Sequence, residues 1–171
     1  QLLDETWMDS CGIFPREDSS LGEASTEKND RICRKLRLTP ADHLLEIGTG
    51  WGGFALHAAQ NYGCRVTTTT ISAAQHERAR GRIKAAGLEG KITLLKEDYR
   101  NLRGRYDKLV SIEMIEAVGL ENLDVYFNTC SDRLKPEGSM LLQSILIRDQ
   151  YYDAARRSVD FIQKHIFPGS G

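Results

Sequence analysis

His43-Leu-Leu-Glu-Ile-Gly-Thr-Gly-Trp-Gly-Gly-Phe54 is the stretch that decides the fold of this 171-residue chain. A short apolar run that ends in closely spaced glycines predicts a strand, a tight loop and the start of a helix. Glycine lets backbone amides approach a ligand closely, and the following helix directs its positive end at the same place. The stretch therefore predicts a site for a nucleotide-like cofactor.

The acid Glu46 lies two residues before the first glycine and helps to distinguish between a dinucleotide and a positively charged cofactor. Gly48, Gly50 and Gly53 fit the dinucleotide pattern G-x-G-x-x-G. A dinucleotide site also expects an acid at the end of the second strand, whereas residues 64–71 end in threonines and an isoleucine. A carboxylate at the mouth of the loop disfavours a pyrophosphate and suits a cation. S-adenosylmethionine carries an ammonium and a sulfonium, and E-x-G-x-G-x-G is typical of methyltransferases with a Rossmann-like fold. We therefore expect S-adenosylmethionine, and a dehydrogenase is a disfavoured alternative.

Length and composition are those of one globular domain without a strong charge bias. Lysine and arginine number 23 and acids 24, so bulk charge gives no reason to expect a nucleic-acid partner. No apolar run approaches the roughly 20 residues of a membrane span. Cys11, Cys33, Cys64 and Cys130 lack metal-like or redox spacing. We therefore expect reduced thiols, a cytoplasmic protein and no metal site.

Strand-like and helical segments alternate, which predicts a mainly parallel α/β sheet with helices on both faces. We expect an irregular N-terminal segment at 1–21, which contributes to the site, and a methyltransferase domain at 22–171. Such a sheet usually has seven strands, so we expect the last strands to be missing and the chain to be part of a longer protein. The fifth strand is then either an exposed edge or covered by something else. The expected elements are helices at about 22–37, 51–61, 72–86, 122–134 and 150–165, strands at about 43–47, 65–70, 92–95, 108–112 and 139–147, and a turn at 135–138.

Side chains near the carboxyl ends of the strands are the candidates for cofactor binding. Ser72 and Gln75 fit a capping box. Thr70 and Gln75 also stand where the ribose hydroxyls would be bound. Asp98 and Tyr99 follow the third strand, where they would bind the adenine amino group and stack beside the ring. The complete predicted set is Ser10, Leu44, Glu46, Gly48, Thr49, Gly50, Gly52, Thr70, Ile71, Ser72, Gln75, Asp98 and Tyr99.

Two acids, Glu113 and Glu116, follow the fourth strand among apolar residues. Burying a charged group is costly unless the group is paired or hydrogen-bonded, so such acids need a reason. We predict that Glu116 takes part in the chemistry. The alternative is a helix N-terminal acid that is favoured by the helix dipole.

A series of motifs occurs in order along nearly the whole chain. These motifs are Asp9-Ser-Cys-Gly12, Glu46-Ile-Gly-Thr-Gly-Trp-Gly-Gly53, Thr70-Ile-Ser-Ala-Ala-Gln75, Asp98-Tyr-Arg100, Ser111-Ile-Glu-Met-Ile-Glu-Ala-Val-Gly119, Leu134-Lys-Pro-Glu-Gly138 and Phe161-Ile-Gln-Lys-His-Ile-Phe-Pro-Gly169. Together they resemble the cyclopropane-fatty-acyl-phospholipid synthase family, which includes the mycolic acid enzymes. The resemblance implies methyl or methylene transfer from S-adenosylmethionine to the cis double bond of an unsaturated phospholipid acyl chain, with a bound bicarbonate as the base.

The resemblance also implies catalytic roles for Cys11, Glu116 and Gln143, which stand at the family's cysteine, glutamate and fifth-strand histidine. Glutamine can donate a hydrogen bond but cannot carry the charge of a histidine. Ala117 stands where the family commonly has another histidine, and the pair Ala117 and Gln143 is similar to the plant-type branch. These departures leave a cyclopropane and a methyl-branched product open.

The same resemblance implies phospholipid acyl chains at a membrane surface as partners, and a position peripheral to the inner membrane face. The helix expected at 150–165 carries Arg156, Arg157 and Lys164, which also suit a solvated face. The oligomeric state stays open, with a homodimer as one alternative. Two other functions stay open as well: a small-molecule N- or O-methyltransferase on the same fold, and an inactive, truncated cofactor-binding domain.

Overall fold

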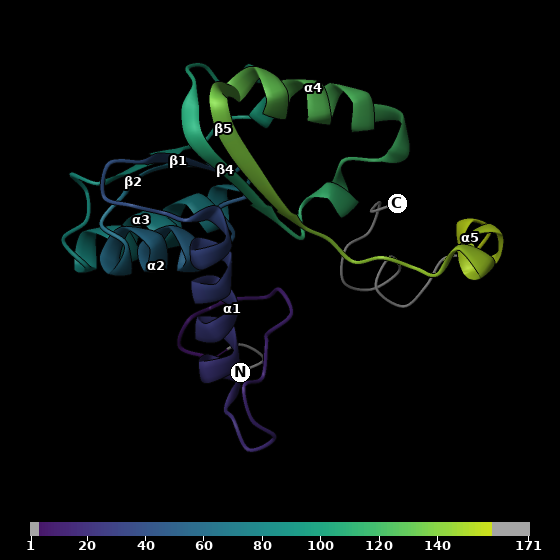
Figure 1. Cartoon of the computed structure of the whole chain (residues 1–171), viewed down its shortest axis with the longest axis horizontal. Coiled ribbons are helices and arrows are strands. Elements are labelled where there is room, and N and C mark those ends of the chain that lie inside the picture. Colours follow the sequence, from purple (N-terminus) through teal and green to yellow (C-terminus); the bar gives the residue numbers. More distant parts are fainter. Residues whose placement is uncertain (1–3, 159–171) are drawn as a thin grey trace.

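A five-stranded sheet lies at the centre of the computed structural model, which describes residues 4–158 (Figure 1). The strand order is β3-β2-β1-β4-β5, and every neighbouring pair is parallel. The predicted α/β class is confirmed, and the glycine-rich stretch follows the central strand. The strands are β1 His43–Ile47, β2 Arg65–Thr69, β3 Ile92–Leu95, β4 Tyr106–Ile112 and β5 Leu134–Gln143.

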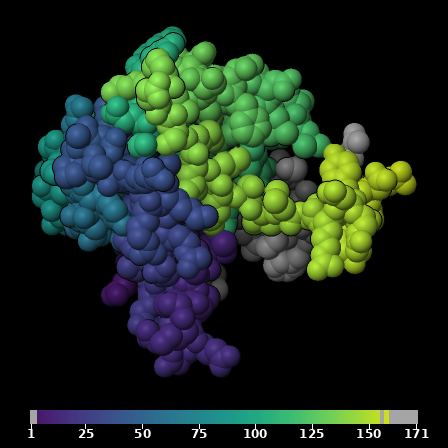
Figure 2. Space-filling model, in the orientation of Figure 1, coloured from purple at the N-terminus to yellow at the C-terminus, as the bar shows by residue number. Residues whose placement is uncertain are grey.

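Helices cover both faces of the sheet, as the alternating pattern predicts. The first three helices lie on one face and α4 lies on the other, while α5 stands away from the sheet (Figures 1 and 2). The helices are α1 Leu21–Leu36, α2 Gly53–Asn61, α3 Ala73–Ala85, α4 Leu123–Arg133 and α5 Asp149–Arg156, with 3-10 turns η1 Tyr99–Asn101, η2 Ile115–Ala117 and η3 Leu120–Asn122.

The pleat of β1 sends alternate side chains into two separate apolar cores. Leu44 lies in the core beneath the first three helices, and Leu45 and Ile47 lie in the core beneath α4. Glu46 shares the Leu44 face because side chains two apart in a strand point the same way. An acid is thereby placed inside the molecule, immediately before the glycine loop.

Helix α1 begins with a complete capping box. The Ser20 hydroxyl accepts a hydrogen bond from the Glu23 amide at 3.2 Å, and the Glu23 carboxylate accepts one from the Ser20 amide at 2.8 Å. The two bonds satisfy amides that have no partner within the helix. The buried stripe of this helix is Ala24, Ser25, Lys28, Asn29, Ile32, Cys33 and Leu36.

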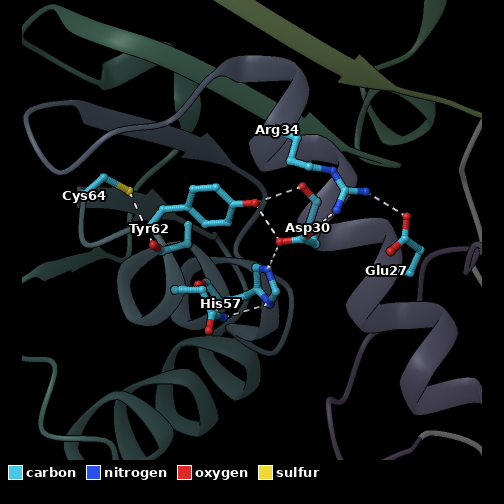
Figure 3. A network of polar contacts seen from close by, with 8 residues as sticks. Glu27, Asp30, Arg34, His57, Tyr62 and Cys64 are labelled. Carbon is cyan, nitrogen blue, oxygen red and sulfur yellow. Dashed lines mark hydrogen bonds and ion pairs between the residues drawn. The ribbon is translucent and has the colours of Figure 1, made fainter.

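A polar network joins α1 to α2 and to the loop that follows α2 (Figure 3). The Tyr62 hydroxyl donates to Asp30 Oδ1 at 2.6 Å, and the same oxygen faces His57 Nε2 at 3.7 Å. Arg34 contacts the Asp30 carboxylate and also donates to Glu27 at 2.9 Å. The hydrogen bond from Tyr62 is the main cause that holds the pKa of Asp30 below its ordinary value. These contacts link α1 to α2 and to the residue that follows it.

Three predicted boundaries are wrong. Residues 135–138 do not form a separate turn but lie within β5, where the pairing with β4 shifts register between Tyr106 and Lys108. A bulge of this kind lets a strand absorb turn-like residues without ending. Strand β5 ends at Gln143 rather than at residue 147, and α5 ends at Arg156. Residues 159–165 of the expected last helix, including Lys164, and the motif at 161–169 lie outside the described residues.

Within residues 4–158, strand β5 lies at the end of the sheet and has a strand neighbour on one side only. None of the helices in this range is long and apolar enough to cross a lipid bilayer.

We predict that Ser20→Ala lowers the free energy of unfolding by about 1 kcal/mol, because the first turn of α1 loses its cap. Urea denaturation followed by tryptophan fluorescence measures the change. Ser131→Ala, an exposed serine within α4, is the matched control and leaves the transition nearly unchanged. Equal stabilities of the two variants would contradict a stabilising role for the cap.

Candidate cofactor and catalytic site

The glycine loop after β1 takes a backbone path that favours glycine. Gly48, Gly50 and Gly52 have φ values of +101°, +51° and +85°, a region that residues with a Cβ rarely adopt. A Cβ on Gly48 would lie 3.1 Å from Met114, which follows β4. The amides of Gly48 and Thr49 donate to the carbonyl oxygen of Thr69 at 3.2 and 3.0 Å. These two amides therefore stabilise the loop itself.

Glu46 is 2% exposed and is linked to the glycine loop through two threonines. Its carboxylate accepts a hydrogen bond from Thr68 Oγ1 at 2.6 Å, and Thr68 Oγ1 lies 2.6 Å from Thr49 Oγ1. Because the Thr68 proton points to the carboxylate, the Thr49 hydroxyl donates to Thr68. Burial raises the pKa of Glu46 to about 8, against the opposing effects of Thr68 and of the Lys28 ammonium. A carboxylate in this state is stabilised by any further cation that comes near it.

The predicted ribose side chains lie together at the start of α3. Ser72 caps the helix by accepting from the Gln75 amide at 3.3 Å. Gln75 does not complete a capping box: its Oε1 accepts from Thr70 Oγ1 at 2.8 Å, and the Ser72 amide donates to Thr70 Oγ1 at 3.1 Å. The Gln75 oxygen therefore bonds the Thr70 hydroxyl in place of the Ser72 amide that a capping box would give it. Ile71 between them is 75% exposed, which leaves an apolar surface beside these polar groups.

The two predicted adenine side chains follow β3. Asp98 caps η1 and forms a bidentate pair with Arg100, with Arg100 Nε and Nη2 at 2.9 and 2.7 Å from its two oxygens. This pairing holds the pKa of Asp98 below its ordinary value. Tyr99 packs edge-on against Tyr126, with ring centroids 5.6 Å apart. Leu44 belongs to the predicted set, but its side chain is fully buried and packs in the apolar core.

The N-terminal segment folds over the start of α2 and over α3. The Trp7 ring meets the Trp51 ring edge-on at 5.9 Å, and the Arg78 guanidinium lies 4.1 Å from the Trp7 ring centroid. A Cβ on Gly53 would lie 2.4 Å from the Met8 sulfur. Residues 7 and 8 of the segment are thereby held next to the glycine loop.

Cys11 and Gln143, which are 132 residues apart, meet at the end of β5. Gln143 Nε2 donates to Cys11 Sγ at 3.2 Å and to Glu113 Oε1 at 2.8 Å, and the Cys11 amide donates to the same Glu113 oxygen at 3.0 Å. Burial, with the adjacent Glu113 carboxylate as the next cause, raises the pKa of the Cys11 thiol. Glu113 has a φ of +46°, a strained backbone for a residue with a side chain. Such strain is kept where the surroundings require one side-chain direction.

Glu116 lies close by in η2 and makes a different contact. Its Oε1 accepts a hydrogen bond from the Ile145 amide at 2.6 Å, while Oε2 is buried and has no hydrogen-bond partner. An unpaired buried acceptor is costly. This oxygen can therefore accept a hydrogen bond from a bound molecule.

Two residues of the site were not selected from the sequence. Glu113 was recognised as an acid in an apolar setting, but Glu116 was chosen for the chemistry. Lys28 was missed: it is 1% exposed and donates to Ser10 Oγ at 2.6 Å. The available signal was its place four residues before Ile32 on the apolar stripe of α1.

The comparisons with known proteins agree with this geometry. The sequence model of the family described as mycolic acid cyclopropane synthetase matches residues 1–171. The chain belongs to this family. It is 40% identical over 169 residues to cyclopropane-fatty-acyl-phospholipid synthase of Escherichia coli strain K12, with 98% of the chain and 42% of the relative covered. It is 38% identical over 169 residues to a probable fatty acid methyltransferase of Pseudomonas putida, with 97% and 43% covered.

A solved structure of the same family has the same fold. The cyclopropane synthase MmaA2 from Mycobacterium tuberculosis matches with a TM-score of 0.89 and 32% identity, over 98% of this chain and 62% of that one. The fold is therefore the Rossmann-like fold of class I methyltransferases. The chain spans about two fifths of the length of the two curated relatives.

All four cysteines lie among residues 4–158 and all are free thiols. Within the same residues no group of three or more histidines, cysteines or acids has a metal-binding arrangement.

We predict that Glu46 makes stability fall as the pH rises. Its pKa is about 8 in the folded chain and near the ordinary 4.5 in the unfolded chain. Between these values the folded state keeps a proton that the unfolded state has released, so the free energy of unfolding decreases from about pH 5 to about pH 8. Glu46→Gln stays neutral and removes this loss, on the order of 2–4 kcal/mol.

Urea denaturation at several pH values between about 5 and 9 measures the effect. Glu89→Gln changes the same charge at an exposed position and keeps the pH dependence of the parent protein. Parallel stability profiles for Glu46→Gln and the parent would show that Glu46 does not titrate in this range.

Proposed function

We propose that this chain is the cofactor-binding part of an S-adenosylmethionine-dependent enzyme that transfers a methyl or methylene group to the cis double bond of phospholipid acyl chains. The product is a cyclopropane or methyl-branched fatty acid. The observation that supports it most is the junction of Cys11, Glu113 and Gln143 at the end of β5, beside the glycine loop. Family membership supports the same chemistry, because both curated relatives named above act on fatty acyl chains by name.

The residues present suit S-adenosylmethionine. Glu46 is a buried carboxylate whose charge a nearby cation would stabilise. The positive φ values of Gly48 and Gly50 let the chain pass close to a ligand. The exposed Ile71 offers an apolar surface beside the hydroxyl of Thr70. A dinucleotide lacks the ammonium and the sulfonium whose positive charges this carboxylate would stabilise.

S-adenosylmethionine, when bound, supplies an electrophilic methyl group. The π electrons of the alkene form a bond to the methyl carbon as the carbon–sulfur bond breaks, and sulfur keeps the electron pair. The transferred methyl group then loses a proton to a base, and the electrons of its C–H bond close the ring. This sequence needs a site with few competing nucleophiles and little water.

Bicarbonate, when bound, would supply that base. Glu116 is suited to hold it, because its buried Oε2 lacks a donor. Gln143 is suited to it only in part, since its Nε2 already donates to Glu113 and Cys11. The Gln143 carboxamide therefore orients Cys11 and Glu113 first. Its neutrality means that it cannot compensate a bound anion by charge, as a protonated histidine could.

An apolar run leads away from this cluster. Ile145, Leu146 and Ile147 are 70%, 86% and 50% exposed, and they begin two residues after Gln143. Such a contiguous exposed patch is typical of an interaction surface. We include in the proposal that these side chains face the acyl chains of a membrane, so that the protein acts peripherally on it.

The test is an assay with purified protein, S-adenosylmethionine carrying a deuterated methyl group, and vesicles of cis-monounsaturated phosphatidylethanolamine. Mass spectrometry of the fatty acids is expected to find label in the acyl chain. A ring keeps two of the three methyl deuterium atoms. A methyl branch formed by proton loss from a neighbouring chain carbon keeps all three, and that chain retains a double bond. Vesicles of saturated lipid are the control and gain no label.

Label that appears in the headgroup amine would instead indicate an N-methyltransferase. Cofactor binding by calorimetry without any labelled lipid would contradict the proposed reaction and support an inactive cofactor-binding domain.

We predict that Glu116→Gln keeps cofactor affinity and lowers turnover about a hundredfold or more, because the amide replaces an acceptor oxygen by a donor. Calorimetry gives the affinity, and the same labelling assay gives the rate. Glu137→Gln, an exposed change of the same kind, is the control. Turnover equal to that of the parent protein would exclude Glu116 from the chemistry.

A further inference from the structure

Lys28 is a lysine inside the protein. It lies on the stripe of α1 that faces the sheet and is 1% exposed, although a charged ammonium is rarely buried without partners. Its Nζ donates to Ser10 Oγ at 2.6 Å, and Ser10 precedes Cys11 in the N-terminal segment. The contact joins the first helix to the segment that supplies the site cysteine.

The groups that face Lys28 come from three parts of the chain. Asp9 and Cys11 lie in the N-terminal segment, Glu46 lies in β1, and Glu113 follows β4. All four are groups that are or become negative, and each favours the charged form of the lysine, whereas burial opposes it. The ammonium is therefore a single positive charge among acidic groups that come from distant positions in the sequence.

The hydroxyl of Ser10 extends this arrangement. Because its oxygen accepts a hydrogen bond from the Lys28 ammonium, the Ser10 hydroxyl hydrogen points away from the lysine. The next residue, Cys11, is held from its other side by Glu113 through its amide and by Gln143 through its sulfur. The short segment is thus fixed between a cation on α1 and a carboxylate beyond β4.

We propose that Lys28 is a positioning residue: its ammonium holds Ser10, and with it Cys11, in place against the Glu113 carboxylate, and so sets both the place and the charge state of the cysteine. Its role differs from that of a lysine which only fills the core, because its charge acts on a neighbouring thiol. The lysine acts through Ser10 and Cys11, and no contact with a substrate is required.

Cys11 reports this role directly. It is exposed, while Cys33, Cys64 and Cys130 are buried, so alkylation by iodoacetamide in the folded protein selects Cys11. The thiolate is the reactive form. The Lys28 charge lowers the pKa of the Cys11 thiol, against burial and the Glu113 carboxylate, which raise it. Removing the ammonium should therefore raise the pH at which Cys11 becomes reactive.

The experiment measures the rate of Cys11 alkylation against pH in the 171-residue chain. Lys28→Met keeps the aliphatic side chain and removes the charge. Its midpoint is expected to rise by about half a pH unit or more, which slows labelling about threefold below the midpoint. Lys28→Arg, which restores a positive charge, returns the midpoint toward that of the parent protein.

Lys35→Met is the matched control, because it removes the same charge from an exposed position of the same helix. Its midpoint stays at that of the parent. Since alkylation needs neither cofactor nor substrate, the result does not depend on the reaction that the enzyme catalyses.

Ser10→Ala keeps the lysine charge and breaks the 2.6 Å hydrogen bond. We expect it to shift the midpoint in the same direction as Lys28→Met, but less, since the cysteine is released from its place near the ammonium. An unchanged midpoint in Ser10→Ala and in a folded Lys28→Met overturns the proposal. If Lys28→Met does not fold, an unchanged midpoint in Ser10→Ala alone overturns it.

Discussion

The structure depends on one unusual constraint, a carboxylate in the middle of a parallel sheet. Strands with both faces covered are normally apolar throughout, yet β1 carries Glu46 between Leu45 and Ile47, 2% exposed. The surrounding structure reduces this cost in two ways: the Thr68 hydroxyl donates to the carboxylate, and the Lys28 ammonium lies near it. Neither removes the cost completely, since the pKa stays raised. A site that keeps such a residual cost at the foot of a glycine loop is prepared for a positive ligand.

The N-terminal segment completes the site by a different principle. Its described residues, 4–20, form neither a helix nor a strand, and aromatic, cationic and sulfur contacts attach them to the domain. Trp7 lies between Trp51 and Arg78, and Met8 fills the space that the missing side chain of Gly53 leaves. These contacts place Cys11 beside residues from the far edge of the sheet. Rigid strands position the cofactor side, while a packed irregular segment positions the cysteine side.

The sequence was sufficient for features that depend on local patterns. Apolar runs, glycines and caps located the five strands, the loop after β1 and the Ser72 cap. It was insufficient where distant groups compete. Gln75 satisfies the capping pattern, but Thr70 binds its side chain instead. Glu113, with a φ of +46°, is the acid that accepts a hydrogen bond from the Cys11 amide, and the sequence does not reveal this backbone. The turn expected at 135–138 was absorbed by pairing with β4, because strand pairing outweighs local turn preference.

The wide separation of the site residues has a consequence for synthesis of the protein. Cys11 meets Glu113 and Gln143 only when positions 102 and 132 residues apart have come together. Contacts of such long range form late, after the loop-closure entropy has been overcome. A growing polypeptide on the ribosome can form α1 and the first βαβ unit well before β5 has emerged. Until β5 pairs with β4, the Cys11 sulfur lacks the hydrogen bond from Gln143, so this contact of the candidate site forms late in folding.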